Sequence, residues 1–148
     1  MSDLPDARTF RILLVEDNAA DIYLFRQALQ RAEMTFELTV INDGGHALAF
    51  ARSETEAFQT AAPDLLVLDL NLPKIGGCEV LEALRQNPNL SNLAVAIMTS
   101  SAASQDYEKC ASLGVSRYII KPLELEEFLR VGEIVKQVLL ESKPEHTP

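Results

Sequence analysis

Five short, strongly apolar segments recur along this chain, and a stretch with helical spacing follows each of them. The apolar segments are Arg11–Val15, Glu37–Ile41, Leu65–Asp69, Ala94–Thr99 and Arg117–Ile120. Short apolar runs of this kind are typical of buried strands. The helical stretches are about Ala20–Arg31, Gly45–Arg52, Cys78–Arg85, Gln105–Leu113 and a region from after Leu123 to Leu140.

This alternation predicts an α/β fold, a doubly wound, five-stranded parallel sheet with helices on both faces. For five strands the commonest order is 2-1-3-4-5, the flavodoxin-like arrangement, with right-handed crossovers. Ligands of such sheets bind beyond the carboxyl ends of the strands, where the strand order reverses. We therefore expect the functional residues directly after the first and third strands.

Length and charge narrow the class of protein further. The 148 residues fit one domain, which we expect at 11–141 between polar tails at 1–10 and 142–148. The net charge of −9 disfavours binding to nucleic acid or to an anionic membrane. The longest apolar run, Leu93–Met98, is far shorter than the roughly 20 residues of a spanning helix. We expect a cytoplasmic protein, since no signal peptide is recognisable.

The chain has two cysteines, Cys78 and Cys110, and their spacing is not that of a metal site. Because the cytoplasm is reducing, we expect both to be free, buried thiols.

Three carboxylates are expected at the reversal of strand order. Glu16, Asp17 and Asn18 follow the first strand, and Asp69 ends the third. Like charges this close repel each other, and a divalent cation such as Mg²⁺ would remove that cost. Taken singly, Asp17 or Asn18 could instead cap a helix, and Asp69 could be a turn residue before Pro73.

Two further strand ends face the same crevice. The fourth strand ends at Thr99 and the fifth is followed by Lys121 and Pro122. A hydroxyl and an ammonium group would supply a hydrogen bond and a counter-charge to a phosphoryl group on Asp69. Alternatively, Thr99 is an ordinary strand residue and Lys121 a solvated strand end. A cis peptide before Pro122 would aim the lysine inward.

With these residues the chain resembles the response-regulator receiver domains, the CheY-like superfamily. The matching positions are the acidic pair Glu16-Asp17, Asp69, Thr99, Lys121 with Pro122, Tyr118 three residues before the lysine, and Gly77 eight residues after Asp69. In the family Asp69 would be the phosphoacceptor, Tyr118 the aromatic switch residue, and Gly77 and Pro122 structural residues. Glu16 stands where Asp is more usual, which implies a longer, water-mediated reach to the metal.

Finer features are similar to single-domain receivers that pair with phytochrome-type histidine kinases. They are the segment DLLVLDLNLPKIGGCEVLEALRQNPNL, the acidic loop Ser53–Asp64 and the helix start LELEEFLRVGEIV. The resemblance implies a sensor histidine kinase, in this subgroup a bacteriophytochrome, as the partner of the protein.

The resemblance also implies a mechanism, in which a phosphohistidine of the kinase gives its phosphoryl group to Asp69. Mg²⁺ or Mn²⁺ would be held by Asp17, Asp69, the backbone carbonyl of Asn71 and, through water, Glu16. Lys121 and Thr99 would bind the phosphoryl oxygens. Asn71 and Ser101 would tune its hydrolysis. The protein would be a switch with slow autodephosphorylation rather than an enzyme.

The output would come from the face formed by the fourth helix, the fifth strand and the fifth helix, as Thr99 moves and Tyr118 fills the space. In the fifth helix Phe128, Val131, Val135 and Val138 form a core stripe, and apolar residues lie beyond it: Leu129, Ile134, Leu139 and Leu140. We expect a homodimer through this face. The alternative is a wide core stripe on a long helix. No segment is left for a DNA-binding output domain, so we expect output through protein contacts.

Other readings stay open on the residues alone. The same fold could act as a relay intermediate or a phosphate sink. A flavodoxin-like electron carrier would need a phosphate-cradling loop where Glu16, Asp17 and Asn18 stand. A phosphatase with an Asp nucleophile would need a second Asp at the position of Asn71.

Overall fold

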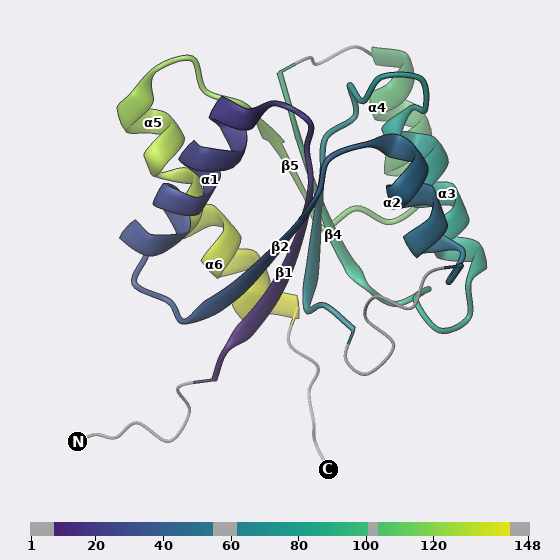
Figure 1. The fold of residues 1–148 in the computed structure, drawn as a ribbon, viewed down its shortest axis with the longest axis horizontal. Coiled ribbons are helices and arrows are strands. Elements are labelled where there is room, and N and C mark those ends of the chain that lie inside the picture. The colour runs from purple at the N-terminus through teal and green to yellow at the C-terminus, as the bar shows by residue number, and fades with distance from the viewer. Residues whose placement is uncertain (1–7, 55–61, 101–103, 143–148) are drawn as a thin grey trace.

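The computed structural model describes residues 8–54, 62–100 and 104–142, with only the backbone of 104–107 (Figure 1). Its strands are β1 (Phe10–Val15), β2 (Phe36–Ile41), β3 (Leu65–Leu68), β4 (Ala94–Thr99) and β5 (Arg117–Ile120). Its helices are α1 (Ala19–Arg31), α2 (Gly44–Ala51), α3 (Gly77–Gln86), α4 (Ser104–Ala111), α5 (Leu125–Leu129) and α6 (Val131–Ser142). All strand pairs are parallel in the order β2-β1-β3-β4-β5, which confirms the predicted fold class.

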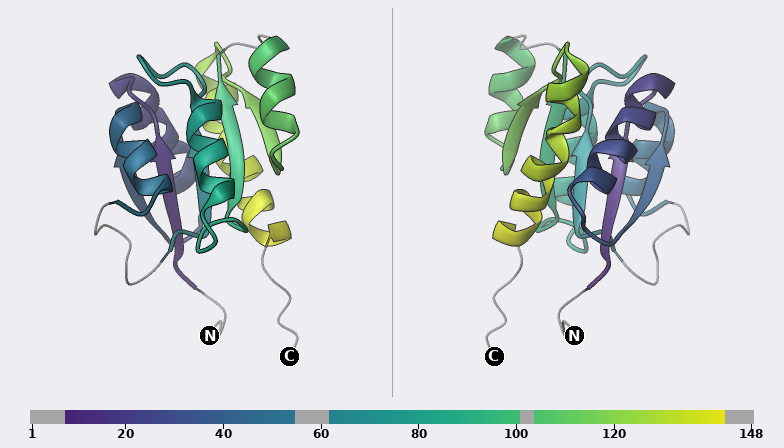
Figure 2. Two further views of the ribbon diagram at one scale, coloured as in Figure 1. Left: turned by 90° about the vertical axis from the view of Figure 1, so that its right-hand side faces the viewer. Right: turned by 90° about the vertical axis from the view of Figure 1, so that its left-hand side faces the viewer.

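The sheet separates two layers of helices, each with its own apolar core (Figures 1 and 2). Side chains alternate between the two faces of a strand, so neighbouring residues of β1 enter different cores. Leu13 and Val15 pack with α2, α3 and α4, whereas Ile12 and Leu14 pack with α1, α5 and α6. All four residues of the central strand β3 are buried. This two-sided burial explains why the strands read as continuous apolar runs.

Helix α1 starts beside the site, and the local sequence determines where it begins. The side chain of Asn18 accepts a hydrogen bond from the backbone N–H of Asp21 at 2.9 Å and so caps α1. Phe25 and Leu29 are fully buried on one stripe of the helix, as the spacing predicted. The amino-terminal end of α1 is therefore fixed both by its cap and by packing below it.

The predicted long fifth helix is wrong as a single element. Arg130 adopts φ −84° and ψ −8°, away from helical values near about −63° and −42°, so α5 ends at Leu129 and α6 starts at Val131. The core stripe is confirmed, because Phe128, Val131, Val135 and Val138 are all buried. Leu139 is also buried and Ile134 packs against the same core, whereas Leu140 is exposed.

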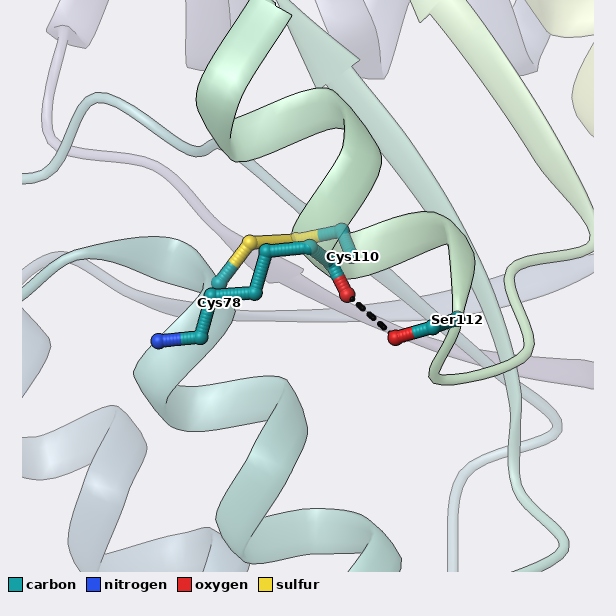
Figure 3. The surroundings of a disulfide bond; sticks show 4 residues. Cys78, Cys110 and Ser112 are labelled. Atoms are coloured by element: carbon teal, nitrogen blue, oxygen red, sulfur yellow. Dashed lines mark hydrogen bonds between the residues drawn. A yellow bond between two sulfur atoms is a disulfide. The ribbon is translucent and has the colours of Figure 1, made fainter.

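The expectation of two free thiols is wrong as well. Cys78 in α3 and Cys110 in α4 form a disulfide, with their Cα atoms 5.5 Å apart (Figure 3). The two residues are 32 positions apart in the sequence, and they meet because α3 and α4 pack side by side on one face of the sheet. Just beyond α4, the Ser112 hydroxyl donates to the carbonyl of Lys109 at 2.9 Å.

Within the described part of the chain, none of the helices has the length and apolar character needed to cross a bilayer. Several predictions concern residues outside the described ranges: Ser101, most of the acidic loop at 55–61, and the tails at 1–7 and 143–148.

Candidate functional site: an acidic crevice with a buried lysine

The site lies at the carboxyl end of the sheet, where ladder hydrogen bonds fix the residues that follow the strands. The backbone N–H of Glu16 donates to the Ile41 carbonyl at 3.0 Å, and that of Asp69 donates to the Val15 carbonyl at 3.1 Å. The backbone N–H of Lys121 donates to the Thr99 carbonyl at 2.8 Å. Strand ends that are far apart in sequence are thereby set beside each other.

Three carboxylates converge in this crevice. Glu16, Asp17 and Asp69 each offer an oxygen, and these oxygens lie within 4.8 Å of one another. Glu16 and Asp69 are only 1% and 4% exposed, while Asp17 is exposed. An all-oxygen donor set with one face open to solvent suits a hard divalent cation that retains some of its water. The described residues therefore fit the predicted Mg²⁺ or Mn²⁺ site.

The ionisation of Glu16 reflects this crowding. Burial raises the pKa of Glu16 to about 7, and the negative charge of Asp69 adds to the rise. The hydrogen bonds to Lys121 and to the backbone N–H of Asn18 oppose the rise in pKa. A cation in the cluster would favour the ionised carboxylate, because it replaces a like-charge contact by an attraction.

The ammonium group of Lys121 is the positive counterpart of the cluster. Its side chain is 9% exposed, and its Nζ lies 2.7 Å from Glu16, 2.8 Å from Asp21 and 3.3 Å from Asp69. Burial alone would lower the pKa of Lys121. The hydrogen bonds to Asp21 and Glu16, with the charge of Asp69, raise it above its usual value instead. Lys121 is thus a fixed positive charge beside Asp69.

Asp21 is a site residue that our sequence analysis missed. It lies in the first turn of α1, where an acidic residue is usually explained by the helix dipole. No local pattern identified it, because its partner Lys121 lies far along the chain. Its contact with Lys121 joins α1 to the end of β5, 100 residues away.

Asn71 joins the acidic cluster to the predicted hydroxyl residue. Its backbone N–H donates to Asp69 Oδ1 at 3.0 Å, and its side-chain amide donates to Thr99 Oγ1 at 3.0 Å. Thr99 is 2% exposed, and Tyr118 is half-buried against the core on the α2–α3–α4 side of the sheet. The structure thus brings together every predicted residue of the metal and phosphate sites that it describes.

Gly77 and Pro122 are the two structural residues that the sequence predicted beside the site, and neither offers a side-chain ligand. A Cβ at Gly77 would lie 2.7 Å from Leu70 Cα and 2.8 Å from the Asp69 carbonyl oxygen. Only glycine lets α3 start this close to the backbone after β3. The peptide before Pro122, for which the sequence left a cis form open, is trans, as are the other peptides of the described residues. Lys121 reaches the crevice by its own length and is held there by its three carboxylate partners.

The chain belongs to the response regulator receiver domain family, whose model matches residues 12–131. This class of protein is a phosphorylation switch rather than a conventional enzyme, and phosphorylation of an Asp is its general mechanism. The flavin-carrier and phosphatase alternatives lose their support, since carboxylates fill the loop after β1 and an amide stands at Asn71.

Among its relatives, the chain is 35% identical to the response regulator Rcp1 of Synechocystis sp. over 131 residues, 88% of this chain and 89% of Rcp1. It is similar to the crystal structure of the phosphorylated cyanobacterial phytochrome response regulator RcpA, with a TM-score of 0.82 and 34% identity over 93% of this chain and 98% of RcpA. The Mn²⁺-bound form of Rcp1 gives a TM-score of 0.80 and 33% identity over 93% of this chain and 99% of that one. The predicted resemblance to phytochrome-associated regulators is thereby confirmed.

Proposed function

We propose that this protein accepts a phosphoryl group on Asp69 from the phosphohistidine of a sensor histidine kinase, in this case a bacteriophytochrome. The observation that carries the proposal is the position of Asp69, almost buried between two further carboxylates and the Lys121 ammonium. The family and the phytochrome-associated relatives support the nature of the donor. We assign 11–141 to the receiver domain and 1–10 and 142–148 to its tails.

In the proposed transfer a carboxylate oxygen of Asp69 bonds to phosphorus while the P–N bond breaks, and its electron pair stays on the histidine nitrogen. Such transfers have a loose transition state, so position and charge neutralisation count for more than a base. Lys121, 3.3 Å from Asp69, supplies a positive charge to the phosphoryl oxygens. Glu16, Asp17, Asp69 and the Asn71 carbonyl would hold Mg²⁺ or Mn²⁺, which supplies further neutralisation of phosphoryl charge when bound.

The proposed switch begins at Thr99. In the present structure its hydroxyl accepts a hydrogen bond from the Asn71 amide. A phosphoryl group on Asp69 offers that hydroxyl a charged acceptor, and hydrogen bonds to charged groups are the stronger ones. Thr99 would then turn toward Asp69, and the half-buried ring of Tyr118 would move into the space that it leaves. Slow hydrolysis, tuned by Asn71 and Ser101, would reset the switch.

The proposed partner surface is a homodimer contact on the side of α4, β5 and α5. Three large apolar side chains cluster in sequence at the end of β5 and the start of α5: Ile120 is 52% exposed, Leu123 99% and Leu125 58%. Ile134 and Leu139 are not part of this surface, because Leu139 is buried and Ile134 packs against the core. Apolar side chains that are this exposed favour association.

Light scattering of the phosphorylated protein tests the dimer. We expect wild type to scatter as a dimer and Leu123→Glu as a monomer, because the charge would be buried at the contact. The matched control is Tyr23→Glu, which places the same charge on α1 at a side chain 62% exposed. Dimers of Leu123→Glu, or a monomeric wild type, would remove this surface from the proposal.

Phosphotransfer tests the function as a whole. A bacteriophytochrome kinase labelled on its histidine is mixed with the protein and Mg²⁺, and the label is followed on both chains. We expect it to move to wild type and to stay on the kinase with Asp69→Asn or after chelation of the metal. We also place the protein in the cytoplasm, where the kinase draws its phosphoryl group from ATP. Transfer to Asp69→Asn would contradict the acceptor assignment.

A further inference from the structure

The three partners of Lys121 differ in one respect that bears on the phosphorylated state. An ammonium group has three N–H donors, and the structure offers it Glu16, Asp21 and Asp69. Glu16 and Asp69 belong to the candidate cation cluster, whereas Asp21 does not. A cation would compete with Lys121 for both carboxylates of the cluster, and a phosphoryl group would occupy an oxygen of Asp69. Asp21 is the partner that neither event removes.

The backbone of Asp21 is held in place by its helix, although the Asp21 side chain is 23% exposed. Its backbone N–H is bound to the side chain of Asn18, the cap of α1. The helix below it is anchored by buried Phe25 and Leu29. A lysine side chain is long and flexible, and holding it in one geometry costs conformational entropy. Because Asp21 sits on a rigid helix, it already restricts the Lys121 side chain before a phosphoryl group is present.

We propose that Asp21 is a positioning residue, which keeps the Lys121 ammonium directed at the phosphoryl site when the metal and the phosphoryl group have taken its other two partners. The proposal rests on the function proposed above. In this role α1 contributes to phosphoryl binding indirectly, through the ion pair between Asp21 in its first turn and Lys121 after β5. Asp21 itself does not touch the phosphoryl group.

Binding of beryllofluoride, a phosphoryl mimic, in saturating Mg²⁺ tests the proposal, with the dissociation constant measured by calorimetry. We expect Asp21→Ala to bind it about tenfold more weakly, the effect of losing one charge-assisted hydrogen bond. Asp21→Asn keeps an oxygen that can accept from Lys121, so we expect affinity within about threefold of wild type. Glu79→Ala is the control, since it removes an exposed carboxylate from the first turn of another helix, α3.

The outcomes distinguish a failure of the Asp21 role from a failure of the proposed phosphoacceptor function. Weak binding by Asp21→Ala, rescue in Asp21→Asn and normal binding by Glu79→Ala support a positioning role; rescue by Asn distinguishes position from charge. If wild type and Asp21→Ala bind equally, Asp21 has no such role and the proposed function stands. If Asp21→Asn falls as far as Asp21→Ala, charge rather than position matters and the inference is overturned. A wild type that binds no beryllofluoride contradicts the proposed function and this inference with it.

Discussion

The two helix layers hold the site by different physical means. On one side, α6 comes so close to α1 that a Cβ at Gly132 would overlap the backbone carbonyl of Ala28. On the other side, α3 and α4 are joined by the disulfide between Cys78 and Cys110. Close packing thus fixes α1, which carries Asp21 and the cap Asn18, whereas a covalent bond ties down α4, the helix that follows Thr99 in the chain.

Because the two layers are held by different means, the two sides of the crevice can be perturbed separately. A packing defect between α1 and α6 should act on the Lys121–Asp21 side of the site. Reduction of the disulfide should act on the helix of the proposed output surface and leave the α1 layer intact. Changes in one layer or the other, and the titration of Glu16 in the crevice between them, should have effects of different size.

Gly132→Ala should have the largest effect. A Cβ there has no room against the backbone of Ala28, and backbone cannot move as a side-chain end can. We expect a loss in free energy of unfolding of about 4 kcal/mol or more, the range of exceptional single changes. Urea unfolding measures it. Gly76→Ala is the matched control, since nothing lies within 4 Å of its added Cβ. Equal stability of both variants would contradict the close approach of α1 and α6.

Loss of the disulfide should come second. Opening a link between residues 32 positions apart frees the unfolded chain, and the expected cost is about 3–4 kcal/mol. Urea unfolding of wild type with and without a dithiol reductant measures it. The control is the double variant Cys78→Ala with Cys110→Ala, whose stability should not respond to the reductant. Two thiols that react with an alkylating agent once the non-reduced protein is unfolded in urea would show that the bond is absent, because both cysteines are buried in the folded protein.

The pH dependence of the metal-free protein is the third test, because it reports on Glu16 within the crevice. Burial raises the pKa of Glu16 to about 7 from an ordinary 4.5. Between these pH values the folded protein keeps a proton that the unfolded chain has released. The free energy of unfolding should therefore fall as the pH rises through this window, by at most about 1.4 kcal/mol per pH unit.

Urea unfolding in the presence of a chelator, at about pH 5 and about pH 7, measures this dependence of stability on pH. Glu16→Gln is the control, since an amide does not titrate and the variant should lack this component. If wild type and Glu16→Gln lose the same stability between the two pH values, another group is responsible for the dependence.

Asn18→Ala should have the smallest effect. It removes the side-chain acceptor for the backbone N–H of Asp21, at a cost of about 1 kcal/mol in the free energy of unfolding. Asn18→Ser should restore most of the stability, because serine is an equally good cap. Thermal or urea unfolding checks both variants. A stability of Asn18→Ala equal to that of wild type would show that α1 does not depend on this cap.

The fold could be predicted because each strand is a short apolar run and each helix has apolar residues at helical spacing. Two strands were predicted with their observed bounds, Ala94–Thr99 and Arg117–Ile120, and the others to within one residue. The convergence of Glu16, Asp17 and Asp69 followed from topology, since parallel strands end at one edge of the sheet.

The features that could not be predicted depend on packing in three dimensions. The Cys78–Cys110 bond requires knowing that α3 and α4 are neighbours, which neither spacing nor compartment reveals. The contact between Asp21 and Lys121 requires the first turn of α1 to lie beside the residue that follows β5, 100 positions further along the chain. The break at Arg130 carries no proline or glycine at that position to announce it.

Phosphorylation by a small phosphodonor such as acetyl phosphate is the sharpest test of Asp69 as the phosphoacceptor, because it needs neither a kinase nor a partner chain. The protein is incubated with the donor and Mg²⁺, and its intact mass is measured beside that of Asp69→Asn. We predict that wild type gains one phosphoryl group, that peptide mapping places it on Asp69, and that the variant gains none. A phosphoryl group on Asp69→Asn, or a wild type that acquires none, would contradict the assignment of Asp69 as the phosphoacceptor.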